Sequence, residues 1–149
     1  MQRFPATRAS KVNRIIDANL NRAKEGLRVC EEVSRFILDS RSLTMAFKGI
    51  RHRISSLVKR SSLYGKMIRE REASTDPGRK IYKNELSRRN YQDIFFANIQ
   101  RVKESLRVLE EFSKLNSAKA AMAFKELRYE VYQIEKRVAE KFTALRRHR

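Results

Sequence analysis

The sequence of 149 residues is 41% hydrophobic and 35% charged, which is typical of one globular domain with a single core. Only four glycines and two prolines are available for turns, which leaves little turn chemistry for a many-stranded sheet and favours an all-α fold. One cysteine excludes an intramolecular disulfide, and no apolar run approaches the roughly 18 residues of a membrane span. We therefore expect a cytoplasmic protein with no membrane partner.

The charge is strongly basic, because 35 lysines and arginines against 17 acidic residues give a formal net charge of +18. The excess is spread over both halves of the chain and is not confined to a tail. Such a distribution is typical of a protein with an anionic ligand or of one that contacts nucleic acid, and it can also reflect a generally basic proteome. No familiar nucleic-acid motif is present, so nucleic acid is the less favoured partner.

Two stretches of the sequence occur twice. Residues 18–36 match residues 97–115 at 11 of 19 positions with an offset of 79. Residues 45–54 match residues 122–131 at five of ten positions with an offset of 77. The chain is therefore predicted to contain a duplicated pair of helices.

The predicted helices form two hairpins within one domain, residues 1–149. Their ranges are about 10–39 and 42–63 in the first hairpin, residues 10–63, and about 90–115 and 118–146 in the second, residues 90–146. Two hairpins that each bury one apolar stripe per helix predict a four-helix bundle. A long crossover loop, about residues 64–89, joins them.

The first predicted helix illustrates the pattern, since apolar residues recur at intervals of three and four. The predicted buried stripe consists of Val12, Ile16, Asn19, Leu20, Ala23, Leu27, Cys30, Ser34 and Ile37. The predicted solvated side consists of Arg14, Asp17, Asn21, Lys24, Arg28, Glu31 and Arg35. Ser42 and Ser117 are predicted to cap the second and fourth helices. Asn90 and Asp93 resemble a capping box at the start of the third.

The crossover contains a turn signal, Asp76-Pro77-Gly78, and is longer than the usual connection of about 2–8 residues in a bundle. One interpretation is a spacer that runs the length of the bundle. The other is a lid over a ligand, because binding residues often lie on loops. Both remain open from the sequence.

Asn19 lies inside the apolar stripe, and Arg22 and Gly26 follow it on one side of the helix. The mirror set in the second repeat is Asn98, Arg101 and Ser105. A buried amide is either a satisfied core group that sets the helix register or part of a polar site. In the second interpretation the small residue leaves room for a ligand, and the guanidinium groups bind phosphate.

Other polar residues also allow two interpretations. Arg51 and Arg128 occupy matching positions and are either surface residues or members of the basic pocket. Glu25 and Glu104 either pair with the arginine three residues earlier or orient it and hold a metal. His52 is more typical of a structural histidine, and two histidines in all exclude a multi-histidine metal site. Neither a Walker-type phosphate loop nor a GxGxxG motif is present.

Over residues 13–137 the sequence resembles a small helical family. The resemblance is carried by DANLNRAKEGLRVCEEVSRF, IRHRI, the loop from Arg71 to Gly78, ANIQRVKESLRVLEEFSKL and FKELRY. The family is the hydroxymethylpyrimidine-phosphate kinase found as the N-terminal domain of some thiamine-phosphate synthases. It implies ATP-dependent phosphorylation of 4-amino-5-hydroxymethyl-2-methylpyrimidine phosphate to the diphosphate, with Mg²⁺. The synthase barrel is absent from this sequence.

The resemblance also implies a set of site residues. Our hypothesis for their roles is Arg22, Arg101 and Asp76 for catalysis; Asn19, Asn98, Arg51, His52, Arg71 and Arg128 for substrate; and Glu72 and Asp76 for the metal. The chain departs from the family loop pattern at Glu72, where the family has Asp, and at Pro77. A non-catalytic partner or regulator of a thiamine-phosphate synthase and a basic nucleic-acid-binding protein are the alternatives, and a homodimer is compatible with each.

Overall fold

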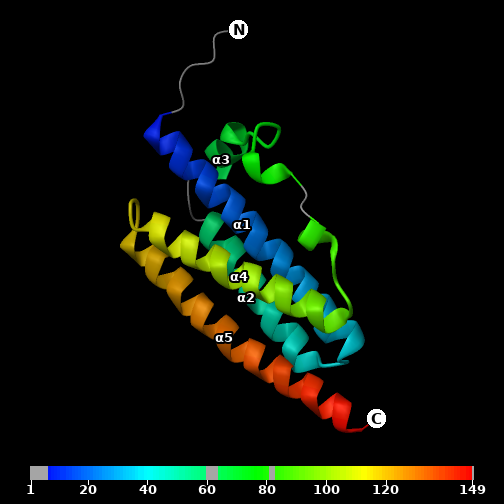
Figure 1. Ribbon diagram of the computed structural model, residues 1–149. Coiled ribbons are helices and arrows are strands. Elements are labelled where there is room, and N and C mark those ends of the chain that lie inside the picture. The colour runs from blue at the N-terminus through cyan, green and yellow to red at the C-terminus, as the bar shows by residue number, and fades with distance from the viewer. Residues whose placement is uncertain (1–6, 60–63, 81–82, 149) are drawn as a thin grey trace.

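The computed structural model describes residues 7–59, 64–80 and 83–148 (Figure 1). The described residues form five α-helices, a π-helical turn and two short 3-10 turns, with no strand among them. The elements are α1 (Arg8–Glu32), the π turn Val33–Ile37, α2 (Arg41–Lys59), α3 (Tyr64–Glu70), the 3-10 turns Pro77–Arg79 and Lys83–Leu86, α4 (Tyr91–Ser113) and α5 (Ala118–Arg147). The all-α prediction is confirmed. No helix in these ranges is both long and apolar enough to span a membrane.

The four long helices share one hydrophobic core. Helices α1 and α4 run side by side in opposite directions and form the largest interface, while α2 packs on α1 and α5 packs on α4 (Figure 1). The largest fully buried side chains come from all four helices: Leu27, Phe47, Ile50, Ile54, Phe95, Ile99, Val102, Leu106, Leu109, Leu127, Val131 and Val138. The apolar stripes predicted from the sequence therefore account for most of this core.

Helices α1 and α4 approach each other closely at Gly26. A Cβ atom at this position would lie 2.7 Å from Val102 Cγ2 and 3.0 Å from the Asn98 carbonyl oxygen. Four residues further along α1, Cys30 Sγ lies 3.9 Å from the carbonyl oxygen of Phe95. The small residue at position 26 thus permits helix packing. The expectation that it leaves room for a ligand is wrong.

The helix ends follow the sequence signals in two of three places. The side chain of Asn90 accepts a hydrogen bond from the Asp93 N–H at 2.9 Å, and that of Ser117 accepts from the Ala120 N–H at 3.1 Å. The prediction for Ser42 is wrong, because the hydroxyl of Ser40 accepts from the Leu43 N–H at 3.4 Å.

Helix α1 does not continue regularly to residue 39 as predicted. The π turn from Val33 to Ile37 takes an extra residue per turn, so the side chains that follow rotate away from the buried stripe. Ile37 is therefore 41% exposed, whereas Leu38 is buried. The predicted burial of Ile37 is wrong for this reason.

The crossover carries a helix that the sequence did not reveal, α3, which packs against the N-terminal half of α1. Asn13 Nδ2 donates to Glu70 Oε2 at 3.1 Å, and the Arg71 guanidinium makes two hydrogen bonds to Asp17, of 2.8 and 2.7 Å. Beyond α3 the chain runs to the opposite end of the molecule, where α4 begins (Figure 1). The spacer interpretation accounts for this path. The last predicted residues of the second helix, 60–63, lie outside the described ranges.

Candidate functional site

Each predicted site asparagine donates one side-chain hydrogen bond within its own helix. Asn19 is buried, and its Nδ2 donates to the Ile15 carbonyl at 2.8 Å. Asn98 is half-buried and bonds the Ile94 carbonyl at the same distance. Each bond uses one of the two amide hydrogens, and no donor among the described residues reaches either carboxamide oxygen. The two oxygens are therefore available as acceptors.

Arg22 and Arg101 are exposed on α1 and α4, at equivalent positions of the two repeats. In the described part of the chain neither guanidinium makes an ion pair or a hydrogen bond. The predicted ion pairs with Glu25 and Glu104 are wrong, since Glu104 instead accepts from Gln100 at 3.1 Å. Two cationic side chains thus lie on the central helices without a counter-ion among the described residues.

Arg51 and Arg128 are instead held by buried glutamates. The two clusters are Glu31 with Arg51 at 3.0 Å and Arg28 at 3.3 Å, and Glu110 with Arg128 at 3.1 Å and Arg107 at 3.1 Å. Glu31 is only 4% exposed, so its predicted place on the solvated side is wrong. Burial opposes ionisation of Glu110, but the hydrogen bonds and charges of its two arginines outweigh burial and hold its pKa below the usual value. Each cluster joins the two helices of its own hairpin, α1 with α2 through Glu31 and α4 with α5 through Glu110.

Arg71 holds the crossover against α1, because its guanidinium group binds both oxygens of the Asp17 carboxylate. Asp17 was also predicted to be solvated, yet it is buried, with Asn21 donating to its carbonyl oxygen and to Oδ1 at 3.0 and 3.3 Å. Asn13 belongs to the same polar side of α1. The sequence offered one signal for this group, namely three short polar residues spaced by four along α1.

Glu72 and Asp76, the predicted metal ligands, stabilise the crossover. Asp76 Oδ1 accepts from the Gly78 N–H at 2.8 Å, and the Glu72 carboxylate accepts from the Ser74 hydroxyl. Across the described residues no three His, Cys, Asp or Glu side chains come together in a way that could hold an ion. A Mg²⁺ ion at Glu72 or Asp76 would therefore need substrate phosphates and waters as its other ligands. The exposed side chain of His52 makes no hydrogen bond or ion pair among the described residues.

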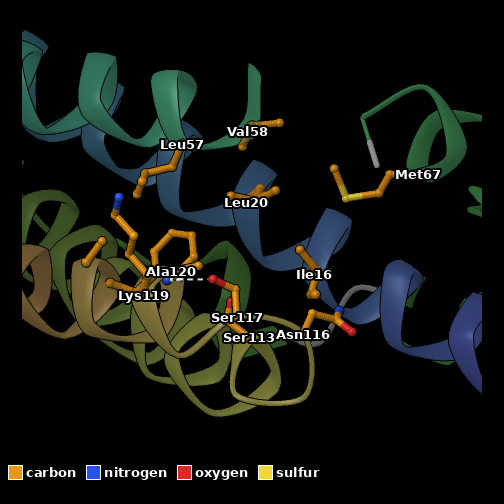
Figure 2. A pocket seen from close by; sticks show the side chains of 12 residues that line it. Ile16, Leu20, Leu57, Val58, Met67, Ser113, Asn116, Ser117, Lys119 and Ala120 are labelled. Carbon is orange, nitrogen blue, oxygen red and sulfur yellow. Dashed lines mark hydrogen bonds between the residues drawn. The ribbon is translucent and has the colours of Figure 1, made fainter. Parts of the chain in front are cut away.

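A cavity of about 440 Å³ opens at the end of the molecule where α3 and the α4–α5 turn meet (Figure 2). Its lining is mostly apolar: Ile16, Leu20, Leu57, Val58, Met67, Ala120, Ala123 and Phe124. The polar lining comes from the end of α4, the turn and the start of α5: Ser113, Asn116, Ser117 and Lys119. None of the residues predicted for the site lines this cavity. The volume is in the range of small-molecule sites.

The equivalent position at the other end is filled by aromatic rings. Phe95 corresponds to Ile16 at the offset of 79, and the Phe142 ring packs against it with centroids 5.7 Å apart. Tyr91 lies 5.9 Å from Phe142 on the same measure. The two ends therefore differ in how their space is filled, although they contain repeated sequences.

Comparison with known proteins associates this chain with thiamine-phosphate synthases. Thiamine-phosphate synthase of Nostoc punctiforme is 39% identical over 125 residues, which cover 83% of this chain and 34% of the relative. The proteins of the same name from Thermosynechococcus vestitus and Rhodopirellula baltica are 36% identical over 133 residues and 37% identical over 122 residues. These alignments cover 88% and 81% of this chain, and 36% and 32% of the relatives.

The chain thus spans about a third of the length of the curated relatives that it matches. No solved structure matches it significantly. The model of the ThiD2 family matches residues 14–137, which is most of the chain. The chain belongs to the ThiD2 family.

Proposed function

We propose that the protein phosphorylates 4-amino-5-hydroxymethyl-2-methylpyrimidine phosphate to the diphosphate, with ATP as donor, in thiamine biosynthesis in the cytoplasm. Membership of the ThiD2 family and relatives named thiamine-phosphate synthase support the pathway. The observation that carries the proposal is the pair Arg22 and Arg101. They are equivalent, exposed and without a protein counter-ion among the described residues, as a site for phosphate groups requires.

The contrast with the other arginines strengthens this choice. The guanidinium groups of Arg51 and Arg128 are partly buried and paired with Glu31 and Glu110, whereas those of Arg22 and Arg101 are exposed and have no counter-ion among the described residues. Phosphoryl transfer depends mainly on positioning the reacting groups and on neutralising the charge of the transferred phosphoryl group. The free guanidinium groups on α1 and α4 supply that neutralisation in the proposed reaction.

The asparagines next to these arginines suit the pyrimidine. Each uses its Nδ2 within the helix, so each carboxamide oxygen can accept a hydrogen bond from an exocyclic amino group. Asn98 is the more accessible of the two and is the proposed contact. Asp76 remains a proposed contributor from the crossover. The Mg²⁺ that the family resemblance implies is proposed to enter with the nucleotide, because Mg²⁺ is usually held by one or two carboxylates together with substrate phosphates.

The direct test is to incubate the protein with ATP, Mg²⁺ and the pyrimidine monophosphate and to detect the diphosphate by mass spectrometry. We expect Arg22→Ala and Arg101→Ala each to reduce turnover by about 100-fold or more, because a charge-neutralising group is lost in the transition state. Arg41→Ala is the matched control, since Arg41 is also exposed on a helix without a partner among the described residues. It should retain full turnover, with an unchanged helical CD spectrum in all three variants.

Absence of the diphosphate with every protein would exclude the kinase. Full turnover in both arginine variants would exclude this site while leaving the reaction in place. A second function is favoured by one observation, which is that the chain corresponds to about a third of each relative. We propose as the alternative a non-catalytic helical partner or regulator of a thiamine-phosphate synthase. Co-purification with such a synthase, together with no ATP turnover, would support it.

A further inference from the structure

We propose that the outer side of α5 binds single-stranded nucleic acid through two exposed tyrosine rings that lie between two lysines. The surface consists of Lys125, Tyr129, Tyr132 and Lys136, and we name it the tyrosine stripe. Because each residue advances by about 100° around a helix and 1.5 Å along it, the stripe occupies a band of about 60° and extends for roughly 16 Å. Helix α5 lies at the edge of the molecule in Figure 1, and every residue of the stripe is exposed.

The tyrosine stripe lies away from the proposed phosphate site. Lys103 of α4 contacts the stripe, with its Nζ 5.3 Å from the centroid of the Tyr132 ring. Arg101 precedes Lys103 by two residues and therefore leaves α4 in a direction about 200° away. The inference thus goes beyond the kinase reaction and does not depend on it.

The two tyrosine rings are both exposed and held in place. Tyr129 is 55% exposed and Tyr132 is 42% exposed, and the rings meet edge-on with their centroids 5.9 Å apart. The Arg128 guanidinium lies 5.2 and 5.8 Å from the two centroids and donates to the Tyr132 hydroxyl at 3.3 Å. The side chains of Arg128 and Lys103 are only 13% and 15% exposed, so the rings cover these cations and present their remaining surface to solvent. The bases of single strands stack on exposed aromatic rings of this kind.

The charge around the rings favours a polyanion. The two lysines of the stripe pair with no acidic residue in the described part of the chain. Of the three glutamates between them, Glu130 pairs with Arg53 at 2.6 Å and Glu135 pairs with Lys103 at 2.9 Å. Glu126 lines a hollow beside Arg53, on the side of α5 that faces α2. The stripe is therefore basic, in a chain of net charge +18, and complements the phosphates of a nucleic-acid strand.

The equivalent stripe on α2 separates the contribution of charge from that of the rings. At the offset of 77 it consists of Lys48, His52, Ser55 and Lys59, so both lysines recur and neither tyrosine does. Helix α2 therefore carries the same two charges without a pair of aromatic rings. We expect nucleic acid to prefer the tyrosine stripe, since stacking there adds to the attraction of the phosphates. An acidic peptide has no bases to stack and would not distinguish the two stripes.

Fluorescence anisotropy of labelled probes tests the proposal directly. The main probe is a strand of about 20 thymidines, which is longer than the stripe. A strand of the same length with abasic sites and a polyglutamate chain of the same length are the probes without bases. We expect the thymidine strand to bind at low salt with a Kd on the order of 1 μM, and both other probes to bind at least about tenfold more weakly.

Variants of the tyrosines test the rings. Tyr129→Ala combined with Tyr132→Ala should weaken binding of the thymidine strand by at least about tenfold, because two stacking contacts are lost. Tyr132→Phe keeps the ring and should retain the affinity of the parent. Phe36→Ala is the matched control and should not affect binding, because Phe36 is a 63% exposed ring beside an arginine on the π turn. The CD spectrum of each variant verifies that it is folded.

Variants of the lysines test the charges. Lys125→Gln combined with Lys136→Gln should reduce the slope of log Kd against log salt concentration by about 1.4, because two phosphate contacts are lost from a single strand. Lys48→Gln combined with Lys59→Gln, the same change on α2, should leave the slope unchanged.

The proposal is overturned if the thymidine strand does not bind, or if the abasic strand or the polyglutamate chain binds equally well. Equal affinity of the parent and the folded tyrosine double variant also overturns it. A loss in Phe36→Ala as large as that in the tyrosine double variant, or equal slopes in the two lysine pairs, would reject the stripe as the site. Since the measurement is strand binding, these results are independent of kinase turnover.

Discussion

The two ends of this helical molecule contain repeated sequences but complete their packing in different ways. At one end the Phe142 ring packs against Tyr91 and edge-on against Phe95, and α5, which supplies it, extends to Arg147. At the other end Ile16 and Met67 border a cavity of about 440 Å³. Repeated sequences can therefore produce tight aromatic packing at one end of the molecule and an unfilled cavity of ligand size at the other.

The strongest test of this comparison is Phe142→Ala. Loss of a buried ring against Phe95 should lower the free energy of unfolding by about 3–5 kcal/mol. Met67→Ala at the open end should lower it by about 2 kcal/mol, because this side chain already borders empty space. Urea denaturation followed by CD at 222 nm measures both. A larger loss for Met67→Ala would contradict the assignment of the ends.

The buried glutamates Glu31 and Glu110 should contribute similarly to the free energy of unfolding. The two ends should then differ in their apolar packing and not in their ion pairs. Glu110→Gln and Glu31→Gln should each destabilise by about 2 kcal/mol at pH 7, because two arginines lose their buried counter-ion.

The pH dependence gives a further check at Glu110. Its pKa is lowered in the folded protein, so its stabilising effect is complete above the usual glutamate pKa, about 4.3, and is lost as pH falls through the lower folded value. The parent should therefore lose stability below about pH 4.3 more steeply than Glu110→Gln. Urea titrations at pH 7, 5, 4 and 3 measure this difference. Parallel profiles would show that Glu110 does not contribute to acid sensitivity.

Small-to-large substitutions address the unfilled volume directly. Ala46→Leu at the filled end should destabilise by roughly 1–2 kcal/mol through overpacking. Ala123→Leu should stay within about 1 kcal/mol of the parent, since the added methyl groups enter the cavity. The difference should appear as several degrees in melting temperature, at about 2–4 °C per kcal/mol. Equal melting temperatures would indicate that both ends have the same free space.

The smallest expected effect concerns Ser34 and Ser113, which occupy equivalent positions at the offset of 79. The Ser34 hydroxyl donates to the Cys30 carbonyl at 2.9 Å, whereas that of Ser113 makes no bond to a described residue. Ser34→Ala should therefore destabilise by about 1 kcal/mol, and Ser113→Ala should have almost no effect on unfolding. Differential scanning calorimetry can resolve this pair. A matching loss for Ser113→Ala would mean that its hydroxyl is satisfied in solution.

Properties that depend on one helix at a time could be predicted from the sequence. The apolar stripes and the caps at Asn90 and Ser117 are of this kind, since the required partners lie within a few residues. The burial of Asp17 and Glu31 was missed because their partners, Arg71 and Arg51, lie 54 and 20 residues away. On an isolated helix both carboxylates belong to the polar side, and only the packed neighbour covers them.

The same reasoning applies to the candidate sites. The sequence identified Arg22 and Arg101 as equivalent. It could not show that the space beside Gly26 is filled by atoms of the neighbouring helix. The cavity left no sequence signal, because its lining residues come from α1, α2, α3 and the α4–α5 turn and meet only in the folded structure. The π turn after α1 has no simple signature either, and it displaced Ile37 from the predicted stripe.

Cys30 makes the contact between α1 and α4 accessible to chemistry. It is the only cysteine in the chain, it is fully buried beside the Phe95 carbonyl, and burial raises its thiol pKa. A thiol in that state does not react with alkylating reagents, since the thiolate is the nucleophile. Modification of Cys30 therefore requires the two central helices to separate. The rate of that modification therefore reports how often the molecule opens between α1 and α4, and its measurement needs no engineered label.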